Sequence, residues 1–370
     1  MRVVHLIDRD DAVGGVQTYL GQLVPGLAAR GIESEVVTGS SISGLLADGP
    51  APPAAALAEL DARLCALAPD VCFLHSPLTP GVAAALAARA PTVGYAHDYA
   101  PVCPGNARFL YTSGRFCEEG VGLRCFWRAY TERTTNRRPD RLLRAYRRVR
   151  AWGDGWPALA RILVASPFVA ALLEEDGAPG ERIRVVAYPV EPAAPAEPER
   201  LADVLFVGRV VGAKGVDVLL RAAAQLGVSV AVAGDGPDRP RLEALAAELG
   251  ADARFLGWIS PERRASLLRG CRVFAMPSLW QEPFVIAGVE ALAAGVPVVA
   301  SDVGGIPSWL VAGGLLVSPG DAEALREALR RVLEEPGLGD RLAAEGPAAA
   351  ARFSLDAHLD LLVPELEAVA

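Results

Sequence analysis

A glycine-rich segment with two cations, GRVVGAKG (208–215), directly follows the apolar run VLFV. Glycines let the backbone approach a ligand closely, and Arg209 and Lys214 stand at the mouth of the helix expected next. The N-terminus of a helix adds its own positive dipole, so the segment predicts a phosphate-binding loop. Its spacing differs from that of a Walker loop and from the GxGxxG of nicotinamide sites.

Lys214 is the only lysine of the chain, and the other Lys/Arg positions are all arginine. A compact ammonium differs from a planar guanidinium in size and hydration, so we interpret position 214 as one that accepts only the ammonium. The alternative is a lysine that has persisted by chance on a loop.

A second group of candidate residues lies in SLWQEPFVIAGVEALAAGVPVVASDVGG (278–305). Glu282 falls in the loop after the run VFAMP, Pro283 suits the first position of a helix, and Glu290 follows about two turns later. Carboxylates accept hydrogen bonds from sugar and ribose hydroxyls. Glu290 stands among apolar neighbours, where a buried carboxylate without a partner would be costly. The backbone amides expected to face an anion are those of Phe284, Val285 and Ile286.

His97 ends the run TVGYAH and precedes Asp98. Ligands of open parallel sheets bind beyond the carboxyl ends of the strands, so His97 is a candidate catalytic residue. The alternative is a core histidine with Asp98 as its partner.

The candidate residues all lie at or after the ends of apolar runs that are expected to be strands, so their positions depend on the sheets. Short β-branched runs alternate with helical patterns throughout the sequence, as in parallel α/β proteins. The expected strands are 3–7, 34–38, 71–75, 92–97, 162–166 and 183–187 in the first half, and 204–207, 229–233, 254–256, 273–276, 298–300 and 315–317 in the second. The expected helices include 16–30, 216–226 and 322–333. The segment PVEPAAPAEPER (189–200) is typical of a linker. We therefore expect an N-terminal domain over 1–190 and a C-terminal domain over 201–352.

With 52% hydrophobic and 22% charged residues, the 370-residue chain has the composition of a globular protein. The net charge of −8 argues against nucleic acid as a partner. No stretch approaches the length of a membrane-spanning helix, and MRVVHLI is expected to be a strand rather than a signal peptide, so we expect a cytoplasmic protein.

Eight arginines cluster within 133–150, at positions Arg133, Arg137, Arg138, Arg141, Arg144, Arg147, Arg148 and Arg150. A basic amphipathic helix there could contact anionic lipid peripherally or meet an acidic substrate; the alternative is a solvated helix face. Nearby, Cys103, Cys117 and Cys125 share a glycine-rich stretch. They could pair or, with His97, hold zinc, but they lack a CxxC spacing, and we expect reduced, unliganded thiols.

The two segments that carry the candidate residues resemble those of the family-four retaining glycosyltransferases, which have the GT-B fold. The family pattern is G-R-x4-K-G, then E-x7-E, then A-x-G-x-P-V-V-A-S. Further matches are GGVQTYL (14–20), VAGDGP (232–237), FLGWIS (255–260) and RFSLDAHLDLLVPELEAV (352–369), so the resemblance spans nearly the whole chain. It implies two Rossmann-like domains whose parallel sheets face across a cleft, with a C-terminal helix, 353–370, that returns to the N-terminal domain.

The resemblance also implies roles for the candidate residues. Arg209 and Lys214 would bind the donor diphosphate and stabilise the leaving group, and Glu290 would hold the ribose. Glu282 would contact the sugar, and His97 would lie near the sugar and the acceptor. The remaining donor-binding positions are Gly14, Gly15, Gly208, Trp258, Phe284, Val285 and Ile286, and the acceptor-binding positions are Asp98 and Tyr99.

The expected activity is retaining, metal-independent hexosyl transfer, without a cofactor, from a nucleoside-diphosphate sugar to an acceptor hydroxyl. Uridine is the commoner base in the family. The insert 101–150, with its aromatic residues and arginines, suits a lipid-linked, polysaccharide or natural-product acceptor. Val285 stands where glycine is usual in the family and is expected to restrict how closely the donor sugar packs. Pro283 replaces the common small residue and lacks an amide donor.

Three alternatives bear on this expectation. The D-x-D match at Asp8 and Asp10, a metal site in another glycosyltransferase fold, is better explained as an acceptor contact or a solvated loop. A phosphorylase would need a lysine for pyridoxal phosphate, yet the sole lysine lies in the diphosphate loop. An inactive GT-B scaffold or sugar-nucleotide sensor would have no need of all four residues Arg209, Lys214, Glu282 and Glu290.

Overall fold

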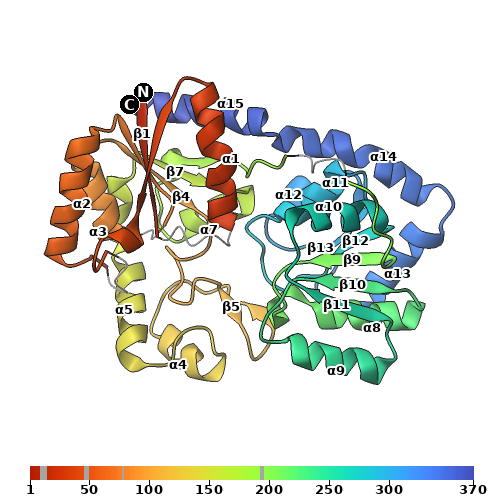
Figure 1. The fold of residues 1–370 in the computed structure, drawn as a ribbon. Coiled ribbons are helices and arrows are strands. Elements are labelled where there is room, and N and C mark those ends of the chain that lie inside the picture. The colour runs from red at the N-terminus through yellow and green to blue at the C-terminus, as the bar shows by residue number, and fades with distance from the viewer. Residues whose placement is uncertain (9–14, 46–49, 77–78, 192–195) are drawn as a thin grey trace. The chain divides into compact units, whose positions relative to one another are not determined.

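The computed structural model describes residues 1–8, 15–45, 50–76, 79–191 and 196–370 (Figure 1). The chain forms two compact units. Unit 1 contains Met1–Ser113, Cys117–Pro189 and Leu355–Ala370, and unit 2 contains Gly114–Phe116 and Val190–Ser354.

Unit 1 is built on a six-stranded parallel sheet with the order β2-β1-β3-β4-β7-β8. Its strands are β1 (Arg2–Ile7), β2 (Glu33–Thr38), β3 (Val71–Leu74), β4 (Thr92–Ala96), β7 (Arg161–Val164) and β8 (Ile183–Val185). Every residue of β3 and β4 is buried, as expected of central strands covered on both faces. All six strands expected for this half of the sequence are present.

Helices cover this sheet and fill the segment between β4 and β7 (Figure 1). They are α1 (Gly15–Ala29), α2 (Ala54–Leu67), α3 (Pro80–Ala87), α4 (Arg124–Thr131), α5 (Pro139–Arg150), α6 (Trp152–Gly155), α7 (Pro167–Glu175) and α15 (Leu355–Glu367). Short 3-10 turns lie at Gly39–Ser41, Trp156–Ala158 and Gly180–Arg182, and the two-residue strands β5 (Phe109–Leu110) and β6 (Arg115–Phe116) precede α4.

The C-terminal helix α15 packs against α1, which confirms the expected return of this helix to the N-terminal half (Figure 1). The hydroxyl of Tyr19 on α1 lies 3.0 Å from Nε2 of His358 on α15. At the surface, Arg30 forms ion pairs with Asp356 and Asp360, at 3.2 and 2.9 Å. A buried contact and an exposed one therefore join the two ends of the sequence.

Unit 2 repeats the plan with a second six-stranded parallel sheet, β11-β10-β9-β12-β13-β14. Its strands are β9 (Val204–Val207), β10 (Val230–Ala233), β11 (Ala253–Gly257), β12 (Val273–Met276), β13 (Val298–Ser301) and β14 (Gly314–Val317). Its helices are α8 (Val216–Leu226), α9 (Arg239–Leu249), α10 (Pro261–Gly270), α11 (Ile286–Ala293), α12 (Ile306–Trp309), α13 (Ala322–Glu334) and α14 (Leu338–Ala350), with 3-10 turns η4 (Gly212–Lys214) and η5 (Ala351–Phe353). The strands expected for this half are all present.

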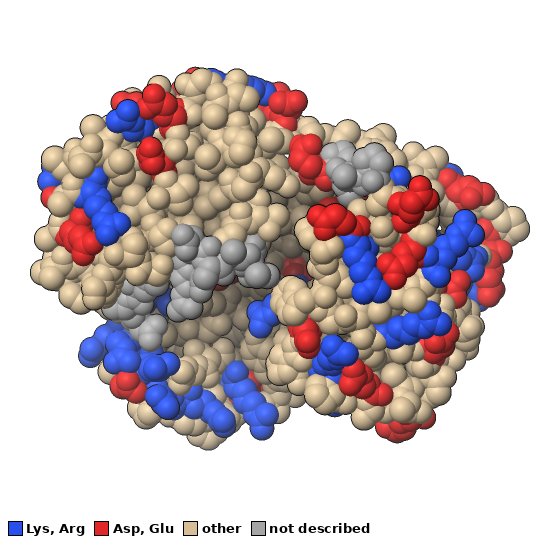
Figure 2. Space-filling view, viewed as in Figure 1, with Lys and Arg blue, Asp and Glu red and all other residues tan. Residues whose placement is uncertain are grey.

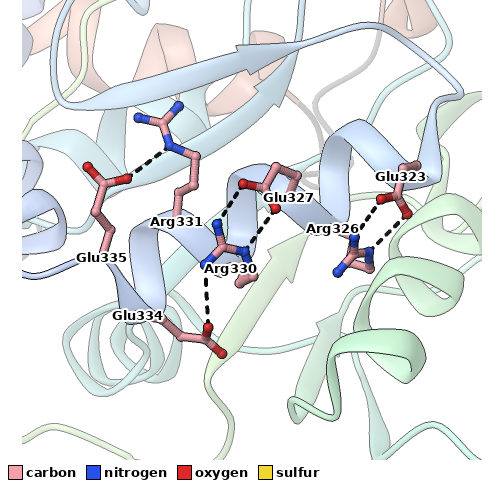
Figure 3. A network of polar contacts seen from close by, with 7 residues as sticks. All are labelled: Glu323, Arg326, Glu327, Arg330, Arg331, Glu334 and Glu335. Carbon is pink, nitrogen blue, oxygen red and sulfur yellow. Dashed lines mark hydrogen bonds and ion pairs between the residues drawn. The ribbon is translucent and has the colours of Figure 1, made fainter.

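The exposed side of α13 carries a ladder of ion pairs at helical spacing (Figure 3). Arg330 pairs with Glu327 at 2.7 Å and lies 3.7 Å from Glu334, one turn in either direction. Pairs at i,i+3 and i,i+4 each add a few tenths of a kcal/mol to helix stability. The opposite side of α13 buries Leu325 and Leu329, so the ladder faces solvent while the apolar side packs on the sheet.

In both sheets the order of the strands reverses next to the first strand of the unit: between β1 and β3 in unit 1, and between β9 and β12 in unit 2. Loops that leave neighbouring strands in opposite directions open a crevice at the carboxyl edge, where α/β proteins bind ligands. The loops after these four strands therefore position the candidate sites.

Candidate functional site

In unit 2, the cation-bearing loop connects β9 to α8 through the 3-10 turn that ends at Lys214. Gly215 follows with a φ of 66°, in the left-handed region. A Cβ atom at this position would lie 1.9 Å from the carbonyl oxygen of Pro277, just after β12. Only glycine satisfies both conditions, so this position brings the loop after β9 against the loop after β12.

Lys214 is held by Glu282 from that second loop. Its Nζ lies 2.7 and 2.8 Å from the two carboxylate oxygens, and the Ser278 hydroxyl donates to Oε1 of the same carboxylate at 2.5 Å. The ammonium also lies 5.1 Å from the ring centroid of Trp280. The Glu282 side chain is 2% exposed and that of Lys214 18%, so the ammonium is the accessible end of the pair.

Arg209 begins the same loop, immediately after Gly208, and is exposed. Within the parts of the chain that the structure describes, no carboxylate forms an ion pair with Arg209. The loop thus offers one cation that a carboxylate anchors, Lys214, and one exposed cation without an ion-pair partner among the described residues, Arg209.

Glu290 lies on α11 with a side chain that is 12% exposed. Its Oε1 accepts a hydrogen bond from Nη2 of Arg264, on α10, at 2.8 Å. Its Oε2 is buried and has no hydrogen-bond partner among the described residues. Burial raises the pKa of Glu290, and the nearby Arg264 opposes that shift. A hydroxyl donor from a ligand would satisfy this oxygen.

The interpretation of Pro283 as the first helical residue was wrong. The helix α11 begins at Ile286, with Val285 as its N-cap. The carbonyl of Glu282 accepts a hydrogen bond from the amide of Gly305 at 2.6 Å. That contact holds 282–285 out of the helix.

The other residues of unit 2 that were predicted to bind the donor differ in their exposure to solvent. The side chains of Phe284 and Val285 are 8% and 7% exposed. The ring of Phe284 packs edge-on against Phe353 at 5.4 Å. Trp258, after β11, is by contrast 69% exposed.

Unit 1 has a cavity of about 350 Å³ at the carboxyl ends of β1, β3 and β4. Its lining includes Asp8 and Gly15 after β1, Ser76 after β3, and the candidates His97 and Asp98 after β4. Of the other candidates, Tyr99 is fully buried, and Gly14 and Asp10 lie outside the described residues. Arg148, from α5, and Asn106 also line the cavity, with Nη2 of Arg148 donating to Oδ1 of Asn106 at 2.7 Å.

His97 is part of a chain of side-chain contacts. Its Nδ1 lies 2.6 Å from the Tyr188 hydroxyl, and its Nε2 lies 3.2 Å from Nδ1 of His75. The Nε2 of His75 lies 3.1 Å from Nδ1 of His5, on β1, whose Nε2 lies 3.3 Å from the Ser34 hydroxyl on β2. Both ring nitrogens of all three histidines are therefore engaged within the protein.

Burial keeps these imidazoles neutral. It lowers the pKa of His5 to about 3 and lowers the pKa of His97. The pKa of His75 is lowered by burial and further by His5 and His97. Because both nitrogens of His97 have partners in the protein, His97 presents a fixed ring to the cavity rather than a free basic nitrogen.

His5 and His75 were missed by the sequence analysis. A signal for His75 was present, because it follows β3 as His97 follows β4, and the two strands are parallel neighbours. His5 lies inside β1, where nothing in the local pattern separates it from a core residue.

The cysteines of the insert are free. Cys103, Cys117 and Cys125 line one small void of about 30 Å³ with Arg128, whose Nη1 lies 3.0 Å from Sγ of Cys117. Over the described ranges, no group of three or more His, Cys, Asp or Glu residues is arranged to hold a metal ion. Over the same ranges, none of the helices is long and apolar enough to cross a membrane.

Two family descriptions match the chain in succession. "Glycosyltransferase Family 4" matches residues 13–194, and "Glycosyl transferases group 1" matches residues 189–348. Among curated proteins, the chain is similar to a D-inositol 3-phosphate glycosyltransferase of Rhodococcus opacus, at 39% identity over 176 residues, covering 43% of this chain and 39% of that protein. It is also similar to an alpha-D-kanosaminyltransferase of Streptomyces kanamyceticus, at 34% identity, covering 43% of this chain and 44% of that protein. The matches therefore span less than half the length of these relatives.

Solved structures match over the full length of the chain. Sucrose-phosphate synthase from Thermosynechococcus elongatus has a TM-score of 0.75 at 21% identity, with 100% of both chains covered. The Anabaena protein Alr3699/HepE in complex with UDP and glucose has a TM-score of 0.69 at 18% identity, also with 100% of both chains covered. At such identities the likeness shows the fold, which is that of the GT-B enzymes.

Proposed function

Because the chain belongs to the family-four glycosyltransferases, we propose that it transfers a sugar from a nucleoside-diphosphate sugar, with uridine as the base, to a hydroxyl of a polyhydroxylated acceptor. The reaction proceeds with retention of configuration, and we propose that it requires neither a metal ion nor a cofactor. One observation carries the proposal: a fixed ammonium and a buried carboxylate with one unpartnered oxygen stand on unit 2, at the edge where its strand order reverses.

Each donor group has a matching residue. The ammonium of Lys214 and the exposed guanidinium of Arg209 bind the diphosphate and stabilise the negative charge that develops on it as it leaves. The Oε2 atom of Glu290 accepts a hydrogen bond from a ribose hydroxyl. The buried Glu282 holds Lys214 in position, and its backbone neighbours Phe284 to Ile286 lie beside the sugar.

The acceptor binds in the unit 1 cavity. Its carboxylates, hydroxyl and amide suit a ligand with many hydroxyl groups. Similar proteins are named for acceptors of that kind: D-inositol 3-phosphate and 2-deoxystreptamine. The sugar and UDP named with the Anabaena neighbour support the donor class in the same way.

In the proposed reaction, the bond between the anomeric carbon and the diphosphate oxygen breaks, and the acceptor oxygen bonds to the same face of that carbon. The acceptor proton passes to an oxygen of the departing phosphate. His97 does not take this proton, because both of its ring nitrogens have partners within the protein. It shapes the acceptor cavity instead.

A ligand-induced thermal shift tests the donor assignment. Purified protein is heated with UDP, GDP, ADP or no nucleotide, and the wild type is compared with Lys214→Arg, which keeps the charge but changes the shape. A nucleotide at 100 times its Kd stabilises the fold by about 2.7 kcal/mol. We expect UDP alone to raise the melting temperature of the wild type, with a much smaller rise in the variant.

Turnover separates an enzyme from a sensor. UDP released from UDP-sugars is measured with and without a panel of polyols, in buffer that contains a chelator. We expect slow release that an acceptor accelerates and the chelator leaves unchanged. Nucleotide binding without any release would favour the sensor, and no shift with any nucleotide would refute the donor assignment.

A further inference from the structure

The charge of the chain is divided very unevenly. Residues 124–150 contain ten arginines and only two carboxylates, Glu132 and Asp140, for a net charge of +8. The whole chain carries −8, so the remaining residues carry −16. In Figure 2, blue side chains gather at the lower left, over the region that α4 and α5 occupy in Figure 1. An acidic protein therefore has one strongly basic surface.

The helix α5 turns most of its arginines outward. Leu142 and Val149 are buried, seven residues apart on its inner side. Arg141, Arg144 and Arg147 recur every three residues and are exposed. Of these, Arg144 pairs with Asp140, and no described carboxylate pairs with Arg141 or Arg147. A row of three cations thus faces solvent, and two of them have no described carboxylate partner.

The neighbouring helix α4 exposes an apolar stripe instead. Leu123, Trp127 and Tyr130 are 79%, 73% and 51% exposed, and their spacing places them on one side of the helix. The two helices are held together by the rings of Phe126 and Tyr146, whose centroids lie 4.9 Å apart. Large exposed side chains at helical spacing are uncommon on a surface that has no partner.

We propose that this surface, formed by Leu123, Trp127 and Tyr130 with the arginines of residues 137–147, binds the anionic face of a lipid bilayer. The arginines contact lipid phosphates, and the apolar stripe enters the boundary between headgroups and acyl chains. Tryptophan and tyrosine are suited to that boundary because each has an apolar body and a polar edge. The attachment is peripheral and reversible.

Charge and apolarity together favour lipid over the other anionic partners. A soluble polyanion would use the arginines but leave the stripe of Leu123 and Trp127 in water. An acidic protein would need a complementary apolar pocket, whereas a bilayer accepts any apolar side chain that reaches it. The arginines of residues 137–147, of which only Arg144 pairs with a described carboxylate, supply the long-range attraction, at about 1 kcal/mol for each arginine near the surface, which corresponds to about fivefold in affinity.

The same helix also reaches the acceptor cavity. Arg148 lines the cavity and, four residues from Arg144 and seven from Arg141, lies on the same side of α5 as those two arginines. A bilayer bound to the arginines of α5 would therefore contact the same side of the helix that lines the acceptor cavity. The lipid-binding surface itself does not depend on the proposed function, and only this link to the acceptor rests on it.

Vesicle co-sedimentation tests the proposal with the full chain and no donor. Vesicles of phosphatidylcholine alone are compared with vesicles that contain about 30 mol % phosphatidylglycerol. We expect the wild type to bind only the anionic vesicles, more weakly at high salt. The triple variant Arg138→Glu/Arg141→Glu/Arg147→Glu should lose at least tenfold in affinity. The matched control, Arg221→Glu/Arg241→Glu/Arg269→Glu, makes the same change in net charge at three exposed arginines of unit 2. Its affinity for anionic vesicles should exceed that of the first triple variant at least tenfold.

A second readout isolates the apolar stripe. Anionic vesicles should shift tryptophan emission to shorter wavelengths in the wild type but not in Trp127→Phe, and Trp127→Ala should weaken binding even at high salt. Equal loss in the two triple variants would show a general charge effect and overturn the proposal. The proposal would also be overturned if a soluble polyphosphate displaced the protein from vesicles and Trp127→Ala bound the vesicles as tightly as the wild type does. A failed UDP shift with intact vesicle binding would refute the proposed function alone.

Discussion

Both carboxylate oxygens of Glu282 lie within hydrogen-bond distance of the Lys214 ammonium, at 2.7 and 2.8 Å. The two residues are 68 positions apart, on the loops after β9 and β12. The pair therefore bridges the point where the strand order of unit 2 reverses. A lysine has three donors, and this arrangement leaves at least one directed elsewhere.

Removing Lys214 should destabilise unit 2 as well as weaken donor binding. In Lys214→Ala the buried Glu282 carboxylate loses its counter-ion, which we expect to cost about 3 kcal/mol of unfolding free energy. Urea denaturation measures the loss. The double variant Lys214→Ala/Glu282→Gln should recover most of that stability without recovering donor binding, because the neutral amide no longer needs a cation. Additive losses in the double variant would mean that the pair is not coupled.

Two glycines of the same loop should respond differently to an added methyl group. Gly215→Ala places a Cβ 1.9 Å from the Pro277 carbonyl oxygen at a φ of 66°. We expect the free energy of unfolding to fall by about 2 kcal/mol or more and the affinity for UDP to fall at least tenfold. Gly212→Ala meets only a side-chain oxygen of Asp238, at 3.3 Å, which can move aside. Thermal melting with and without UDP compares the two. A tolerated Gly215→Ala would contradict the close approach of the two loops.

Acid should destabilise unit 1 selectively. All four histidines lie in unit 1, where burial lowers the pKa of His5 to about 3 and of His358 to about 4, and lowers those of His75 and His97 as well. An exposed histidine has a pKa of 6.5, so these residues take up protons when the protein unfolds below that pH. The free energy of unfolding is therefore highest above pH 6.5 and falls as the pH drops toward 4. At about 1.4 kcal/mol per pH unit for each of the four histidines, the loss of unfolding free energy approaches about 5 to 6 kcal/mol per pH unit near pH 5.

Hydrogen exchange at pH 7, 6 and 5 measures the protection of the backbone amides, and hence the local stability, of both units in one molecule. Unit 2 contains no histidine and is the internal reference. The raised pKa of Asp98 in unit 1 acts in the opposite direction, because that carboxyl stabilises the fold as it becomes protonated. Equal acid sensitivity of the two units would contradict the prediction.

The three histidines of the chain of contacts should share one tautomer. A hydrogen bond between neutral imidazoles needs one N–H and one lone pair, so a proton on Nδ1 of His5 requires one on Nδ1 of His75 and then of His97. The other consistent state has all three protons on Nε2. With only four histidines, ¹⁵N-histidine labelling gives a spectrum in which each ring can be assigned. Mixed tautomers among the three rings would contradict the contacts.

A substitution at the far end of this chain of contacts should be felt at the cavity. His5→Phe removes the partner of His75 while keeping a ring of similar size. We expect the nitrogen signals of His75 and His97 to shift and the KM for acceptor to rise several-fold, with the donor KM unchanged. His358, which bonds to Tyr19 and to the Ala187 carbonyl instead, is the control, and its signals should not move.

Local pattern was sufficient for much of the fold. Runs such as VLFV before Gly208 and VFAM before Pro277 were predicted as strands because their β-branched and aromatic residues are bounded by turn residues, and they form β9 and β12. The placement of Arg209 and Lys214 in a loop between strand and helix followed from the same pattern. Such a pattern is local, however, and does not determine the order of the strands in either sheet.

Contacts between distant segments were beyond the sequence. Lys214 and Glu282 were both assigned to the donor, yet nothing in their local patterns indicated that they pair with each other. Arg264 was not recognised as the partner of Glu290, because α10 and α11 meet only through the fold. Pro283 satisfied the local preference for a helix start, but the contact between Glu282 and Gly305 overrode it.

The return of α15 to unit 1 has a consequence for the order of events during synthesis. Ribosomes release a chain from its N-terminus, so every residue of unit 2 emerges before Leu355–Ala370, which complete unit 1. Until α15 arrives, Tyr19 lacks its contact with His358, and the face of α1 that α15 covers remains bare. The unit that begins the sequence is therefore the last to be finished, and unit 2 can fold on the nascent chain before unit 1 is stable.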